Sequence, residues 1–290
     1  MVGISETSRQ ELRDMLKEHQ LMDYADDIED LAEGYVYLTL TDEDTYQQVG
    51  NTRIGGVPDL PTTIEWAKTD NGYMSFLAQI NLAELPQLPD SPLPEHGMLY
   101  FFHEYDASFS GKHHVSYSDS MKNELRKSNN LANGTQVSYS PFSVKISDSY
   151  YLPDSLEKAN TLADFANLGM KLNEANFQHW LIDIWNPFAS KFFDWYYDKT
   201  DNPDVSMILG QHSFLRPYLL HEAERVRLQK SYSYKPSQVD LKYWIILLQL
   251  GSHEKSNMVW HDAGFFDFAI HTDDLAKRDF SKTFAAIVSS

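Results

Sequence analysis

Cysteine is absent from the 290-residue sequence, and several other features that would indicate a function are missing as well. Without cysteine the chain has no disulfide, no thiolate nucleophile and no zinc or iron–sulfur site with cysteine ligands. The longest apolar run, Tyr243 to Leu250, is far shorter than the roughly 20 residues that span a bilayer. The first residues lack the basic and apolar segments of a secretory signal. We therefore expect a cytoplasmic protein without a membrane partner.

Sequence motifs of common catalytic, phosphate-binding and metal-binding sites are missing too. Neither GxxxxGK[ST] nor GxGxxG occurs, and there is no GxSxG nucleophile motif. The segment HEAER comes close to HExxH, but Arg225 stands at the second ligand position, and arginine does not bind zinc. His113 and His114 are neighbours in a predicted strand, so they point to opposite faces. The sequence identifies no catalytic residue, and we expect neither a metal nor a cofactor.

Acidic side chains outnumber basic ones, and the excess is concentrated at the start of the chain. The net charge is −18, and residues 1–45 carry thirteen acidic side chains against three basic ones. This charge disfavours nucleic acid and anionic membranes as partners and favours a basic protein. The candidates for binding such a partner are Asp26, Asp27, Glu29 and Asp30. The alternative is that these charges only keep the surface solvated.

The order of the predicted elements indicates an α+β protein. Residues 1–34 form an acidic helical lead, because apolar residues recur there at spacings of three and four. In residues 35–290, strand-like and helix-like runs come in blocks rather than in regular alternation. Such an order favours a mainly antiparallel, roll-like sheet with helical additions. The aromatic block at residues 179–197 is interpreted either as core or as a surface for a partner.

One pattern occurs twice in the sequence. Gln79 stands in an apolar, strand-like run that is followed by Gly97 and an aromatic strand, and Gln249 stands in a second run of the same kind. A glutamine inside an apolar strand costs free energy unless its amide is hydrogen-bonded, so both amides are expected to bridge backbone groups. We predict two related sheet units, at about residues 50–150 and 205–290, with chance similarity as the alternative.

Segments near both ends of this region resemble a known family. They are IGGVPDLP, SFLAQINLAELP and GMLYFF on one side, and MVWHDAGFFDFAI and DDLAKRDFS on the other. Together they resemble the YwqG-like family, a bacterial domain of unknown function, from about residue 50 to the end. The chain departs from the family where Ala67 follows Trp66 in place of proline. The resemblance implies a mainly antiparallel roll with helical additions and no established activity; some members look like parts of toxin–immunity gene clusters.

The stretch TRIGGVPDLP, at residues 52–61, contains the first group of ligand-binding candidates. Arg53 can clamp a carboxylate or phosphate, and the amides of Gly55 and Gly56 can form a small anion-binding nest. The alternative is a turn that presents the following hairpin, because glycine permits positive φ and the two prolines hold an extended path.

The segment WHDAG contains the second group of candidates, Trp260, His261 and Asp262. The two polar side chains can orient a ligand or act as an acid and a base. The alternative is that Asp262 only caps the turn before the next strand.

Two functions of different classes remain open. The first is a non-catalytic protein that neutralises or scaffolds a basic partner, as an immunity-type protein does. The second is an enzyme or small-ligand-binding protein with a polar cleft between the two sheet units, using Arg53, Gln79 and Asp262. The absence of a complete catalytic motif and the acidic lead favour the first hypothesis.

Overall fold

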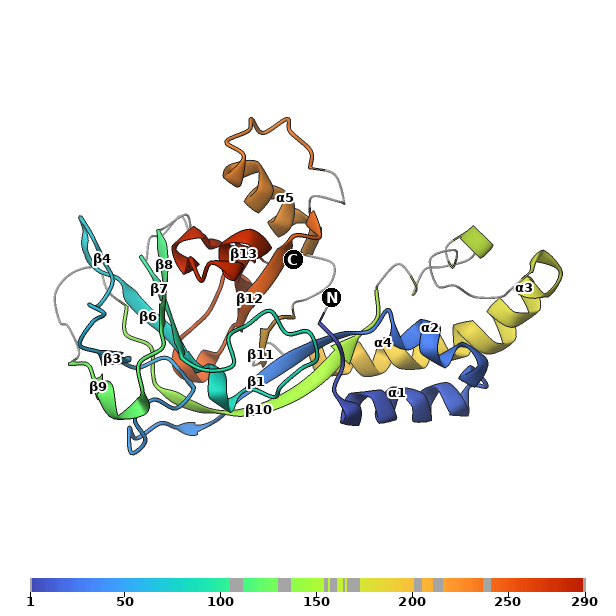
Figure 1. Ribbon diagram of the computed structural model, residues 1–290, viewed down its shortest axis with the longest axis horizontal. Coiled ribbons are helices and arrows are strands. Elements are labelled where there is room, and N and C mark those ends of the chain that lie inside the picture. The colour runs from blue at the N-terminus through green and yellow to red at the C-terminus, as the bar shows by residue number, and fades with distance from the viewer. Residues whose placement is uncertain are drawn as a thin grey trace.

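The computed structural model describes residues 2–104, 112–129, 137–153, 156, 161–163, 165, 173–200, 205–210, 216–236 and 241–288. Within these residues, ten strands form one antiparallel sheet that curls into a nearly shut barrel, and a group of helices forms a lobe beside it (Figure 1). The predicted α+β class and the mainly antiparallel sheet are therefore confirmed. None of the helices in this part of the chain is both long and apolar enough to cross a membrane.

The large sheet has the strand order β14-β13-β12-β11-β1-β10-β2-β6-β7-β8. Its strands are β1 (Glu33–Glu43), β2 (Arg53–Ile54), β6 (Ser75–Asn81), β7 (Met98–His103), β8 (His113–Ser118), β10 (Phe142–Tyr151), β11 (Val205–Ile208), β12 (Trp244–Gly251), β13 (Phe265–His271) and β14 (Phe284–Val288). Two small pairs lie outside it, β3 (Asp59–Pro61) with β9 (Leu125–Lys127) and β4 (Lys68–Thr69) with β5 (Gly72–Tyr73).

The helices are concentrated before β1 and between β10 and β12. The α-helices are α1 (Glu6–Glu18), α2 (Ala25–Glu29), α3 (Glu174–Trp180), α4 (Asn186–Thr200), α5 (Arg216–Arg227) and α7 (Thr272–Ala276). A π-helical turn, η6 (Leu181–Trp185), joins α3 to α4. Short 3₁₀ turns are η1 (Met22–Tyr24), η2 (Leu82–Glu84), η3 (Lys122–Glu124), η7 (Glu254–Ser256) and η8 (Phe280–Lys282).

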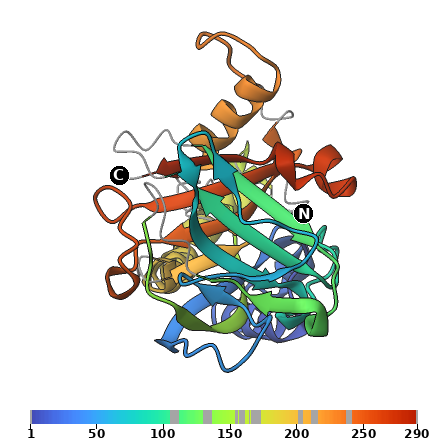
Figure 2. The same cartoon turned by 90° about the vertical axis from the view of Figure 1, so that its left-hand side faces the viewer.

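The two ends of the sheet, β8 and β14, approach each other at a seam. His113 at the start of β8 donates a hydrogen bond from Nε2 to the backbone oxygen of Thr283, over 2.8 Å, just before β14. Inside the barrel, the rings of Phe101 and Phe268 meet edge to face with their centroids 5.1 Å apart. Figure 2 shows β6, β7 and β8 in teal and green in front of the orange and red strands of the other half. Contact across the interior and the seam therefore gives the sheet its barrel form.

Five strands lie on each side of the centre of the sheet, which is the pairing of β1 with β10. Strands β1 and β10 are antiparallel, with Leu38 opposite Ile146, Thr39 opposite Lys145 and Leu40 opposite Val144. Strands β10-β2-β6-β7-β8 lie on one side of this centre, and β1-β11-β12-β13-β14 lie on the other. Strand β1 thus completes the second half, although it precedes the first half in the chain.

Both glutamine-containing segments are strands that pair with the aromatic strand that follows. Gln79 on β6 lies opposite Tyr100, and Gln249 on β12 lies opposite Asp267. A register shift lies two residues before each glutamine, between Phe76 and Ala78 in β6 and between Ile246 and Leu248 in β12. Such bulges re-aim side chains and bend a strand, and here they occur at matching positions.

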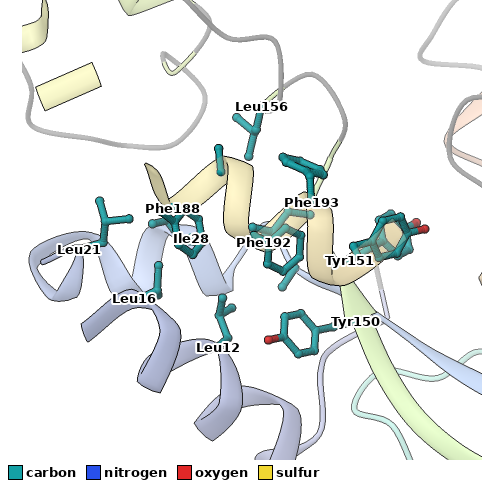
Figure 3. Packing of buried hydrophobic residues seen from close by; sticks show 14 of the residues in the cluster. Leu12, Leu16, Leu21, Ile28, Tyr150, Tyr151, Leu156, Phe188, Phe192 and Phe193 are labelled. Atoms are coloured by element: carbon teal, nitrogen blue, oxygen red, sulfur yellow. The ribbon is translucent and has the colours of Figure 1, made fainter. Parts of the chain in front are cut away.

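The helical lobe is built on aromatic side chains (Figure 3). Leu12 and Leu16 from α1 and Phe188 and Phe192 from α4 point into one cluster, with Tyr150 at the end of β10 beside them. Most of the aromatic block at residues 179–197 is buried in this cluster, which supports its interpretation as core rather than as a surface for a partner. The sequence also predicts a helix over residues 162–185; its second part forms α3 and η6, and residues 162–172 lie largely outside the described residues.

The glycine pair in the stretch at residues 52–61 adopts a conformation that other residues avoid. Gly55 and Gly56 both have φ of +76°. A Cβ on Gly55 would lie 2.1 Å from the backbone oxygen of Ser140, and a Cβ on Gly56 would lie 2.2 Å from the hydroxyl of Tyr46. The left-handed backbone and the close approach both require glycine here.

We expect Gly55→Ala to lower the free energy of unfolding by about 2 kcal/mol or more, because the left-handed backbone alone costs an L-residue roughly 1–2 kcal/mol. Gly56→Ala should be similarly harmful, but less so in a Tyr46→Phe background, where the hydroxyl is gone. Tyr46→Phe should not relieve Gly55→Ala, whose obstacle is backbone. Urea unfolding of the single and double variants measures how strongly Tyr46→Phe is coupled to each glycine substitution. Equal coupling for Gly55→Ala and Gly56→Ala would contradict this account.

Candidate functional site

Arg53 lies inside the protein, at the centre of a polar network. Its side chain is 0% exposed and makes ion pairs with Asp59 and with Asp44, whose Oδ2 is 3.5 Å from Nε. The guanidinium also lies over the ring of Tyr46, 4.5 Å from the centroid, and Lys127 covers the same ring at 3.6 Å. A buried arginine between two carboxylates is already neutralised, so this arrangement supports a structural role.

Gln79 connects this network to the neighbouring backbone. Its Oε1 accepts a hydrogen bond from the backbone nitrogen of Asp59 over 2.7 Å. Its Nε2 donates to the backbone oxygen of Asn51 over 2.8 Å and to Asp59 Oδ2 over 2.9 Å. The same carboxylate oxygen accepts from the backbone nitrogen of Gly50 over 2.9 Å. The glutamine therefore ties a loop to the sheet through backbone groups, as expected from its place in an apolar strand.

The two glycine amides of the predicted anion-binding nest already donate hydrogen bonds within the fold. The backbone nitrogen of Gly55 donates to the oxygen of Leu77 over 2.7 Å, and that of Gly56 donates to the oxygen of Tyr139 over 2.9 Å. Neither amide is directed at an open site, so the glycines support the interpretation of this segment as a turn rather than as a phosphate loop.

The second half places a different group at the matching position. Gln249 lies between Met207 on β11 and Asp267 on β13, whereas Gln79 lies between Arg53 and Tyr100. Gln249 Nε2 donates to Asp267 Oδ1 over 2.9 Å. No cation pairs with this carboxyl among the residues that the structure describes. Burial consequently raises the pKa of Asp267 to about 7, although the glutamine amide acts in the opposite direction.

A buried serine–histidine pair was not predicted from the sequence. Ser206 Oγ lies 3.0 Å from His253 Nε2, and the same hydroxyl accepts from the backbone nitrogen of Gly251 over 3.1 Å. In the other half, Thr52 Oγ accepts from the backbone nitrogen of Asn81 over 3.0 Å in the same way. Because both members of the pair are 0% exposed and the hydroxyl contact is repeated, we assign it a structural role.

Of the three ligand-binding candidates in the WHDAG segment, one is buried and two are exposed. Trp260 is buried and donates from its indole nitrogen to the backbone oxygen of Gly251 over 3.1 Å. His261 and Asp262 are exposed, and the backbone is left-handed at His261 (φ 49°) and at Ala263 (φ 56°). The tryptophan thus anchors the turn, and the two polar residues face solvent.

None of the eight predicted ligand-binding residues lines three of the surface cavities that the described residues form. The most polar one, of about 450 Å³, lies beside the seam and is lined by Lys68, Thr69, Lys112, His113 and His114 among others. Burial lowers the pKa of both histidines, so the charge there comes from the two lysines and from Asp70, which also lines the cavity. Within the described part of the chain, no group of three histidine or acidic side chains is placed to hold a metal ion.

Most carboxylates of the helices in the acidic lead are exposed, but two of the predicted partner-binding residues are not. Its exposed carboxylates, which we call the acidic surface, are Glu6, Glu11, Asp14, Glu18, Asp23, Asp26 and Asp30. Asp27 is half-buried. Glu29 is buried and forms ion pairs with Arg9 and Arg13, so it joins α1 to α2 instead of facing solvent. The helical periodicity that predicted the two helices could not identify this contact between them.

Comparison with known protein families gives one match. A family model described as a domain of unknown function, DUF1963, matches residues 52–287. No curated protein matches the chain. The matched region begins just before Arg53 and ends in β14, so it covers the described barrel except for β1 and includes α3, α4 and α5.

Replacing Arg53 tests the buried network. Arg53→Met places in the first half the residue that the second half has at the matching position, and it leaves the carboxylate of Asp59 uncompensated. We expect a loss of about 3–5 kcal/mol in the free energy of unfolding. The double variant Arg53→Met with Asp59→Asn should lose less than the sum of the two single changes. Additive losses in urea unfolding would contradict a coupled pair.

The raised pKa of the buried Asp267 should make the stability of the protein depend on pH. Its pKa is raised from 3.8 to about 7 in the folded protein, so the folded state keeps the proton that the unfolded state releases. Stability from this group is present at low pH and is lost as the pH rises from about 4 to about 7. As the pH rises from about 5 to about 8, the free energy of unfolding of Asp267→Asn should increase by on the order of 2 kcal/mol relative to that of wild type. Urea unfolding at several pH values measures this difference. Asp262→Asn is the exposed control, and parallel profiles for Asp267→Asn and wild type would contradict the prediction.

Proposed function

The chain belongs to the DUF1963 family of unknown function, and on that premise we propose that it is a non-catalytic protein-binding module whose acidic surface captures a basic protein. The observation that carries the proposal is the exposure of seven carboxylates on α1, α2 and their connection, on a lobe with a rigid aromatic core. A fixed array of like charges attracts an oppositely charged partner and accelerates the encounter.

The arrangement of the neighbouring cations strengthens this surface. Arg9 and Arg13 both contact the buried Glu29, and Arg13 also contacts Asp26. Part of their charge is therefore used inside the lobe, so the outer carboxylates are compensated incompletely. Lys191 on α4 pairs with Glu18 at the far end of α1. The surface around Asp23, Asp26 and Asp30 thus keeps the excess of negative charge that a basic partner would recognise.

The interior of the barrel gives less support to an enzyme. Arg53 and Gln79 are fully buried and hydrogen-bonded or ion-paired within one network, whereas Asp262 is exposed on a turn of the other half. None of the three residues of the catalytic hypothesis lines the three cavities described above. A substrate would have to displace existing ion pairs to reach the arginine.

Two finer assignments belong to the same proposal. We infer from the terminal signatures that the chain is YwqG-like, with an immunity-type neutraliser as one form of the function. We also infer that the two halves of the barrel arose by duplication, because the bulges, the glutamines and the hydroxyl contacts of Thr52 and Ser206 occupy matching positions. Neither assignment changes the surface on which the binding is proposed.

A small-ligand-binding protein, or an enzyme acting on such a ligand, is the second candidate. It is favoured by the polar cavity beside the seam, where Lys68 and Lys112 supply two positive charges against the one carboxylate of Asp70. His113 lines this cavity and is bonded to Thr283 of the other half, so a ligand there would lie where the two halves meet. Such a site would take a small anion rather than a protein.

Charge reversal tests the proposed function. Asp26→Lys with Asp30→Lys should reduce capture of the basic partner in pull-downs from the native host, and wild-type capture should weaken from about 0.1 M to about 1 M salt as the Debye length falls from about 10 Å to about 3 Å. The melting temperature should stay nearly unchanged, because exposed charges contribute little to stability.

A matched control separates local charge from net charge. Glu65→Lys with Glu95→Lys changes the net charge equally, at exposed positions of the barrel. This variant should retain the partner. Equal recovery of the same proteins by the wild type and the Asp26/Asp30 variant would leave the acidic surface as a solubility feature and would refute the proposal.

A further inference from the structure

The acidic chain carries one basic projection. Residues 225–236, RVRLQKSYSYKP, contain four basic side chains and no acidic one, in a protein of net charge −18. They form the end of α5 and the loop that follows, which stand away from the barrel at the top of Figure 1. We call these residues the basic projection. The predicted function does not use them.

Two of its four cations have partners within the same molecule. Arg225 pairs with Glu222 and lies 4.2 Å from the ring centroid of Tyr232. Arg227 lies 3.7 Å from Glu224 and 3.5 Å from Asp273. Lys230 and Lys235 are exposed, and no ion pair joins them to any residue that the structure describes. These two lysines are therefore the part of the projection that can attract an external anion.

The same segment carries exposed apolar side chains. Tyr232 in the loop is 88% exposed, and Val226 near the end of α5 and Leu228 just after it are exposed as well. Tyrosine and arginine are enriched at protein interfaces, where an apolar centre is bordered by charged groups. The projection therefore has the composition of a protein contact rather than that of a merely solvated loop.

The charge of the projection is complementary to the acidic surface of the same chain. That surface presents Asp23, Asp26 and Asp30, with the exposed side chain of Met22 beside them. Within one molecule the two regions lie on different parts of the structure, with α5 above the barrel and α1 and α2 on the lobe below (Figure 1). We infer that the basic projection of one copy docks on the acidic surface of a second copy.

Net repulsion between two acidic chains does not prevent this contact. At physiological salt the Debye length is about 8 Å, so the charges near the interface decide the interaction and the distant ones are screened. The contact joins two different surfaces, so it is heterologous and does not by itself close a two-fold dimer. Self-association should therefore grow with protein concentration and weaken with salt.

The inference is independent of the basic partner in the proposed function, but it concerns the same acidic surface. A basic protein bound there would occupy the position of Lys230 and Lys235 from the second copy. Self-association and partner capture would then compete. Experiments on the purified chain alone test the first without requiring the second.

Sedimentation velocity of the purified full chain provides the test. Wild type should show a concentration-dependent rise in mean sedimentation coefficient at about 0.1 M salt that disappears at about 1 M. Lys230→Glu with Lys235→Glu should abolish the rise, and so should Asp26→Lys with Asp30→Lys. Mixing these two variants should restore association, because the reversed surfaces are complementary to each other again. Circular dichroism establishes that both variants remain folded.

Several results would overturn the inference. Wild type that stays monomeric at low salt would do so, as would association that survives either reversal, or a mixture of the variants that does not associate. The variant Glu65→Lys with Glu95→Lys should associate like wild type, which excludes a general effect of net charge. If self-association follows this pattern and no basic partner is captured, the proposed function fails while this inference stands.

Discussion

The antiparallel pairing of β1 with β10 is the constraint on which the rest of the structure depends. It is the only ladder that joins the two halves of the described sheet at its centre, with Thr39 opposite Lys145. It also connects the barrel to the helical lobe, because Tyr150 and Tyr151 at the end of β10 enter the aromatic core between α1 and α4 (Figure 3). Loss of this register would separate the halves and remove one wall of the lobe core.

The two halves stabilise the same strand geometry with different chemistry. Around Gln79 a buried carboxylate, Asp59, is supplied by β3, outside the large sheet, and is neutralised by Arg53. Around Gln249 the carboxyl of Asp267 comes from the sheet itself, and Met207 takes the place of the arginine. The first arrangement fixes a loop through charge and hydrogen bonds. The second keeps a proton at low pH, so its contribution to stability depends on pH below neutrality.

The sequence predicts the parts of this structure that have a local signal. A glutamine in an apolar strand indicates a bridged amide, and two such strands indicate the paired units. Burial cannot be predicted in the same way, since it depends on contacts between distant segments: nothing local shows that Glu29 faces Arg9 and Arg13 or that Arg53 is enclosed. The contact of Ser206 with His253 spans 47 residues and has no motif. The position of β1 in the second half is set by its pairing with β11, which is distant in the sequence.

The division between interior and surface determines where function can be sought. Arg53, Asp59 and Gln79 in the interior already contact one another, so changing them alters mainly the free energy of unfolding. The acidic surface and the basic projection carry charges that the fold leaves exposed, so changing them alters encounters with other molecules at little cost in stability. Their opposite signs mean that each limits what the other can bind. The basic partner that we propose and the second copy that we infer would compete for the same carboxylates, and salt would weaken both contacts together.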